Sequence, residues 1–326
     1  MTPDPTLSAL SDHLFSISVA LYSVAVLAFC AQLAFGRRTA AAPQPELVAA
    51  GGAPLPPAAP GAPGEAAPEP ASSRRWGTVG VAVTALGVLT HIGVLVARGL
   101  SVGRLPWGNM YEFATAMILV AVVAFMIFAV RMPAVRHLGA FVLGPAVLAM
   151  VLVGLFLYTD AGPLVAALRS YWLAVHVTAA ITGFGIFFVS SIASMAYLVR
   201  TRYDVKLAAG TARTDSTIGR LPPAAALDRV AHRTAVFGFP IWTFAVIAGA
   251  IWAESAWGRF WGWDPKETWA FITWVVYAAY LHARTTAGWR GRPAAWINVT
   301  GLLVLIFNLL YVNMVSTGLH SYAGLK

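Results

Sequence analysis

Apolar stretches of about 19 residues or more recur along this chain and constrain its fold more than any other feature. At about 1.5 Å per helical residue, such a stretch crosses a hydrocarbon core of roughly 30 Å. Only 11% of the residues are charged, so the chain lacks the polar surface that a water-soluble fold requires. Because an open sheet leaves unpaired backbone groups in lipid, the sequence predicts an all-α, polytopic membrane bundle.

Hydropathy predicts about eight transmembrane helices, at residues 14–35, 78–97, 112–130, 138–158, 173–199, 234–256, 266–283 and 294–315. The first run has neither a basic segment before it nor a small-residue cleavage site, which favours a retained helix. Residues 39–75 are dense in Pro, Ala and Gly and predict a disordered cytoplasmic linker. We therefore expect three parts, at 1–38, 39–75 and 76–326, with no repeat of fixed period.

Charge in the loops predicts the orientation of the bundle. The chain carries 22 Lys and Arg and a formal charge of +9. These residues lie between the spans, so we expect no nucleic-acid partner. With the N-terminus outside, 16 of the 22 basic residues fall in inner segments, including a predicted inner loop at 200–233. This distribution favours an N-out, C-out topology. The single cysteine, Cys30, lies within the first span, so the chain holds no CxxC pair.

Tryptophan is concentrated in one region of the chain. Half of the 12 tryptophans fall between residues 252 and 274, at Trp252, Trp257, Trp261, Trp263, Trp269 and Trp274. An interfacial aromatic belt would explain one or two of them. Their gathering in one loop and one helix entry favours a ligand platform instead. We expect Trp257, Trp261 and Trp263, with Phe260 and two glycines between them, to form a flat shelf for a planar ligand.

Two carboxylates in this region have the spacing of a helix start rather than of a catalytic pair. Asp264 precedes Pro265, and Glu267 follows at the third helical position, which is the pattern of a capping box. Asn109 and Glu112 form a looser version before the third span. We therefore assign no proton transfer to these side chains.

Histidines near both membrane faces are the remaining candidates, because a histidine within an apolar span is costly unless it has a function. The predicted topology places His176 and His320 at the level of the tryptophan region, where two imidazoles could bind haem iron axially. His282 lies 17 residues after Pro265, about 25 Å away along a helix, and so near the other face. His91 differs from it by roughly 15 Å in depth, which disfavours joint ligation.

The segment WGRFWGWDPKETWAFITWVVYAAYLHAR resembles the WWD signature of haem-handling proteins in cytochrome c assembly. Further segments resemble the System II branch, of the CcsA or ResC type: GRLPWGNMYEF, YWLAVHV, GFPIWTFAVIAGAIWA and the final GLHSYAG. The similarity covers roughly residues 76–324, with the WWD loop at about 252–274.

This resemblance implies that haem b is carried and presented on the outer face of the bacterial plasma membrane to an apocytochrome c with a CxxCH motif. By motif position, His176 and His320 hold the outer haem iron and His282 serves an inner haem site. Asp264 and the tryptophans 257, 261, 263 and 269 belong to the haem-binding region. A CcsB or ResB type membrane protein is the implied partner, and the pair forms a holocytochrome c synthase, or haem lyase. Arg259 or Lys266 could pair with a haem propionate.

Three other readings remain open at this point. A System I protein of the CcmC or CcmF kind shares the WWD signature. A b-type cytochrome subunit also carries histidines near both faces, although such subunits enclose haem between facing helices. A haem-free scaffold or lipid transporter would bind no chromophore.

Overall fold

The computed structural model describes residues 3–35, 70–164, 168–213 and 216–320, with the Ala134 side chain left aside. All regular elements in these ranges are helices. The first half contains α1 (Pro5–Phe35), α2 (Ala71–Val102), α3 (Met110–Arg131), the short η1 (Pro133–Leu138) and α4 (Gly139–Phe156). The second half contains α5 (Tyr171–Ala208), η3 (Thr217–Arg220), α6 (Ala224–Trp257), α7 (Pro265–Thr285), α8 (Arg292–Phe307) and the π-helical η4 (Asn308–Val312). The all-helical prediction is confirmed.

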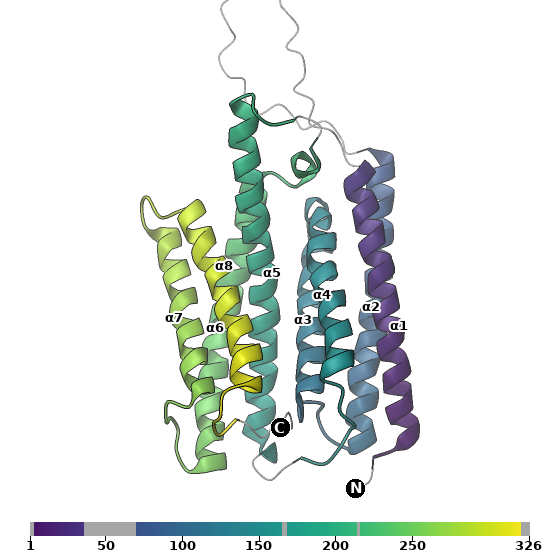
Figure 1. Ribbon diagram of the computed structural model, residues 1–326, viewed down its shortest axis with the longest axis vertical. Helices are drawn as coiled ribbons and strands as arrows, with labels where there is room; N and C mark the ends of the chain where they lie inside the picture. The colour runs from purple at the N-terminus through teal and green to yellow at the C-terminus, as the bar shows by residue number, and fades with distance from the viewer. Residues whose placement is uncertain (1–2, 36–69, 165–167, 214–215, 321–326) are drawn as a thin grey trace, which may run out of the picture.

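The two halves lie side by side, with α1–α4 on one side of the bundle and α5–α8 on the other (Figure 1). Glycines allow the helices of each half to approach closely. Gly80 and Gly87 of α2 face Phe29 and Tyr22 of α1, and a Cβ atom on either glycine would lie under 3 Å from the ring. Across the halves, Gly185 of α5 lies against the backbone of α3 at Ala121. The helix contacts therefore depend on ring-into-glycine packing.

Seven of the described helices are long and apolar enough to cross a membrane. The eighth, α7, has 21 residues, but its Trp, Tyr and Thr side chains lower its hydropathy. It nevertheless runs beside α6 and α8 along the bundle (Figure 1). The helix positions agree with the predicted spans.

Several helices extend beyond their predicted ends. Residues 71–75, within the predicted linker, form the first turns of α2; residues 39–69 of that linker lie outside the described part of the chain. The predicted inner loop at 200–233 is much shorter than we predict from sequence. Residues 200–208 continue α5, and residues 224–233 begin α6. A hydropathy window ends where charged residues begin, but the backbone hydrogen bonds of a helix continue past that point.

Candidate functional site: a paired-histidine aromatic cavity

The site lies at the end of the bundle where α6 passes into α7 through residues 258–264, hereafter the tryptophan loop. Gly258 ends α6 in the left-handed conformation, with φ of 70°. Asp264 then starts α7 by accepting from the Lys266 backbone N–H at 2.9 Å, and Glu267 completes the capping box through the Asp264 N–H at 3.1 Å. The predicted capping box is confirmed. The capping box fixes the residue at which the tryptophan loop ends and α7 begins.

Glu267 also holds the middle of the tryptophan loop. Its carboxylate accepts from the Gly262 N–H at 2.8 Å and pairs with the Arg259 guanidinium at 2.9 Å. A side chain at Gly262 would collide with Arg259, since a Cβ atom there would lie 2.1 Å from the guanidinium carbon. The Arg259 guanidinium is thus held by Glu267, whereas the Lys266 Nζ donates to the Asn308 carbonyl at 3.2 Å.

His176 comes from the first turns of α5. Its Nδ1 donates to the carbonyl oxygen of Ala245 in α6 at 2.8 Å, and its ring stacks on Trp252 with centroids 5.9 Å apart. Gly249 makes room for this ring, since a Cβ atom there would lie 2.7 Å from the imidazole. A histidine that ligates metal usually donates its other ring N–H to such an acceptor, which directs Nε2 toward the metal.

His320 follows the end of α8 and is anchored in the same way. Its Nδ1 donates to the Asp264 carboxylate at 2.8 Å, and the same carboxylate accepts from the Leu319 N–H at 2.7 Å. Burial raises the pKa of Asp264, but the hydrogen bond and charge of His320, with the N–H groups of Lys266 and Leu319, outweigh it and hold the pKa at about 2. The carboxylate is therefore ionised at neutral pH.

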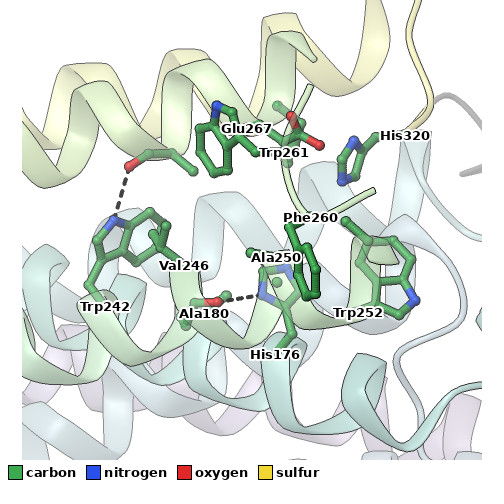
Figure 2. A pocket seen from close by; sticks show the side chains of 15 residues that line it. His176, Ala180, Trp242, Val246, Ala250, Trp252, Phe260, Trp261, Glu267 and His320 are labelled. Carbon is green, nitrogen blue, oxygen red and sulfur yellow. Dashed lines mark hydrogen bonds between the residues drawn. The ribbon is translucent and has the colours of Figure 1, made fainter. Parts of the chain in front are cut away.

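Both histidines face one cavity of about 60 Å³, hereafter the loop cavity. Figure 2 shows His176 and His320 reaching it from opposite sides, with Trp242, Trp252, Phe260 and Trp261 around it. Between Trp242 and Trp252, the α6 face of the cavity carries Ala245, Val246, Gly249 and Ala250. Its lining is mostly apolar and aromatic with a few polar groups, a composition typical of a cofactor site.

The tryptophans do not form the flat shelf that we predict from sequence. The rings of Trp261 and Trp263 are perpendicular, at 90°, and Trp263 is 65% exposed. Trp257 instead packs its edge against His320, with centroids 4.9 Å apart. Trp269 packs on Phe307 of α8. Loop spacing alone cannot predict these ring orientations, which depend on contacts with other helices.

The sequence places Trp252 in the tryptophan cluster but does not single it out as a ligand-binding residue. Its ring is fully buried and contacts both histidines, at 5.9 Å and 5.7 Å between centroids. Trp242, which donates to the Ala270 carbonyl at 3.2 Å, was also missed.

The other histidines lie elsewhere. His282 is exposed in the last turn of α7, at the opposite end of that helix from Pro265, as its spacing predicts. His91 is fully buried in α2, where its Nδ1 lies 3.2 Å from the Tyr22 hydroxyl of α1. Each therefore belongs to a different environment from the loop cavity.

Fold and site together define a polytopic membrane protein with a paired-histidine aromatic cavity next to a tryptophan-rich loop. A family model described as Cytochrome C assembly protein matches residues 107–320. The chain belongs to this family, and its role lies in cytochrome c assembly.

Curated relatives agree with this assignment. The chain is 34% identical to "Cytochrome c biogenesis protein CcsA" of Gloeobacter violaceus, covering 76% of this chain and 87% of the relative. Proteins of the same name from Synechococcus elongatus and Guillardia theta are each 36% identical, covering 76% of this chain and 86% of the relative.

A solved structure shares the fold. "Cytochrome c Heme Lyase CcmF" superposes with a TM-score of 0.57 at 14% identity, covering 94% of this chain. The chain spans 50% of the length of that protein. At this identity the likeness shows a common helical architecture.

Proposed function

We propose that this protein binds haem b between His176 and His320 and presents it to an apocytochrome c with a CxxCH motif. The presenting site lies on the outer face of the bacterial plasma membrane. The observation that carries the proposal is the shared anchoring of the two imidazoles. Each donates Nδ1–H to a fixed acceptor, Ala245 or Asp264, and both line one aromatic cavity. This pattern is the one expected of two axial ligands.

The chain's own residues orient the haem and limit the access of water and oxidants. Trp252 and Trp257 pack against the imidazoles, which restricts the ligand rings to narrow orientations. Lys266 lines the cavity and donates to the Asn308 carbonyl of η4 at 3.2 Å, so its amine would be available to a haem propionate. Positioning of this kind accelerates a reaction without acid–base chemistry by the protein.

Attachment then consists of two additions. The client histidine replaces one axial imidazole, and each cysteine thiol adds across a haem vinyl group. In each addition an S–C bond forms, the S–H bond breaks, and the hydrogen moves to the other vinyl carbon. The addition therefore needs no external oxidant or reductant, provided that the client thiols arrive reduced. The protein acts as the haem-presenting subunit of a holocytochrome c synthase of the System II type.

A second membrane protein, of the CcsB or ResB type, completes this complex in our proposal. The exposure of His282 supports it, because an exposed imidazole on α7 can share a ligand with a neighbouring chain. Such an inner haem site would lie at the opposite end of α7 from Asp264.

The decisive test is the haem content and absorption spectrum of the protein purified with its partner. We expect a low-spin haem spectrum whose outer-site component is lost in the His176→Ala, His320→Ala double variant. The control is His13→Ala, an exposed histidine on α1, which should leave the spectrum unchanged. Equal haem content in wild type, the double variant and His13→Ala would contradict the assignment of His176 and His320 as ligands. A haem that stays bound during incubation with a CxxCH peptide would favour a b-type cytochrome instead.

A further inference from the structure

A second loop in the chain is built like the tryptophan loop. Residues 103–109, between α2 and α3, begin with a left-handed glycine and an arginine and end with an N-cap, followed by a glutamate at the third helical position. The four residues have the same spacing in both loops: Gly103, Arg104, Asn109 and Glu112 in the first, Gly258, Arg259, Asp264 and Glu267 in the second. We call residues 103–109 the twin loop.

The twin loop repeats the contacts of the glutamate as well as the spacing. We call these contacts, in which the carboxylate pairs with the loop arginine and accepts from a loop glycine N–H, the clamp. The Glu112 carboxylate pairs with Arg104 at 2.8 Å and accepts from the Gly108 N–H at 2.7 Å, as Glu267 does with Arg259 and Gly262. A second arginine, Arg98, also reaches Glu112, at 3.3 Å, and both of these side chains are fully buried. The twin loop is therefore held at least as firmly as the tryptophan loop.

The clamp holds Trp107 at the wall of a second cavity, which the paired histidines also line. This second cavity, of about 110 Å³, lies next to the start of α3, and Trp107 lines it together with Phe113 and Leu173. Four residues line both this cavity and the loop cavity: His176, Trp252, Lys266 and His320. The two cavities therefore meet at the two histidines, one beside each loop.

The indole N–H of Trp107 is a second observation that points to a ligand. Its indole N–H is buried and has no hydrogen-bond partner among the described residues. A buried donor without an acceptor is costly, and a ligand that offers an acceptor removes the cost. The unpartnered N–H lies on a residue whose backbone is fixed by the neighbouring clamp.

We propose that the twin loop is the second wall of the haem site and that Trp107 contacts the haem. An iron atom held between His176 and His320 has its macrocycle extending to both sides of the ligand axis. One edge then lies in the loop cavity against Trp261, and the other edge lies in the second cavity against Trp107. This inference rests on the proposed function, because it takes haem as the ligand of the two histidines.

The test measures haem release from the full chain purified with its partner. Haem loss to excess apomyoglobin is followed by absorbance for wild type, Trp107→Leu and Trp107→Phe. The control is Trp289→Leu, an exposed tryptophan between α7 and α8 at the other end of the bundle. We expect Trp107→Leu to release haem about tenfold faster than wild type, because it loses an aromatic contact. Trp107→Phe keeps a flat ring and should release haem at a rate between those of wild type and Trp107→Leu.

The outcomes separate the two proposals. If the histidine double variant loses its haem but Trp107→Leu releases haem at the rate of Trp289→Leu, the twin loop is no part of the site. If the histidine double variant keeps its haem, the proposed function itself fails. A Trp107→Leu protein that aggregates on size exclusion is replaced in the comparison by Trp107→Phe, whose release rate must then exceed that of wild type.

Discussion

At the scale of single residues, the site depends on a few side chains that each satisfy several groups. Asp264 caps α7, accepts from the Leu319 N–H and orients His320. Gly249 acts through its size alone, because the absence of a side chain leaves the space that the His176 ring occupies. The first role depends on charge and the second on volume, so different substitutions test them.

Replacing Gly249 by alanine should displace His176. The new Cβ atom would lie 2.7 Å from the imidazole, closer than real contacts allow, so the ring must move away from the Ala245 carbonyl. We expect at least tenfold weaker haem retention, which corresponds to about 1.4 kcal/mol. Gly144→Ala in α4 is the matched control, because no atom lies within 4 Å of its Cβ position. Equal haem retention in the two variants would contradict the role of Gly249.

Replacing Asp264 by asparagine separates the capping role from the ligand-orienting role. Asparagine keeps an oxygen that can cap α7, but it lacks the negative charge that makes the His320 imidazole a stronger donor to iron. We expect the haem midpoint potential to rise by on the order of tens of millivolts. A spectroelectrochemical titration measures it, with exposed Asp160→Asn as the control. An unchanged potential would mean that Asp264 serves only as a helix cap.

At the scale of elements, the two clamped loops carry the site, and their glutamates differ in burial and in number of partners. Glu112 is fully buried between Arg98 and Arg104, whereas Glu267 pairs with Arg259, which is 31% exposed. A charge buried with two partners leaves both uncompensated when it is removed. The structural cost of losing the clamp should therefore be greater in the twin loop.

We expect Glu112→Gln to destabilise the protein by about 3–5 kcal/mol, because the buried Arg98 loses its anion. Thermal unfolding in detergent measures this as a fall in Tm. Glu254→Gln, an exposed glutamate near the end of α6, should change stability by less than about 0.5 kcal/mol. A Glu112→Gln protein as stable as Glu254→Gln would show that the network contributes nothing net to stability.

At the scale of the whole molecule, the bundle separates the two classes of histidine. His176 and His320 lie at the end that carries the tryptophan loop, and His282 lies at the opposite end of α7. The orientation of the bundle in the membrane decides which face each group of histidines lies on. The distribution of basic residues predicts that the tryptophan loop faces outward.

Thiol labelling of whole cells tests that orientation. In a Cys30→Ala background, Asp160→Cys and Ala287→Cys each introduce one exposed thiol, at opposite ends of the bundle. We expect a membrane-impermeant maleimide to label Asp160→Cys in intact cells and Ala287→Cys only after permeabilisation. The reverse pattern would overturn the N-out, C-out topology and, with it, outward presentation of haem.

The sequence by itself determined the features that depend on neighbouring residues. Apolar runs predict the helices, because a segment in lipid must satisfy its own backbone. The cap at Asp264 follows from a four-residue pattern that closes its own hydrogen bonds. The candidacy of His176 and His320 follows from their depth and their family motifs, and the structure brings both to one cavity.

Only the tertiary structure decided which side chains share that cavity. The contact of Trp252 with both histidines joins α5, α6 and the segment after α8. Trp263 and Trp269, by contrast, point to solvent and to α8. Trp107 lines the adjoining second cavity, which shares both histidines with the loop cavity, although it lies far from the tryptophan loop in sequence. Ring orientation is set by packing between distant helices, and a local pattern contains no information about that packing.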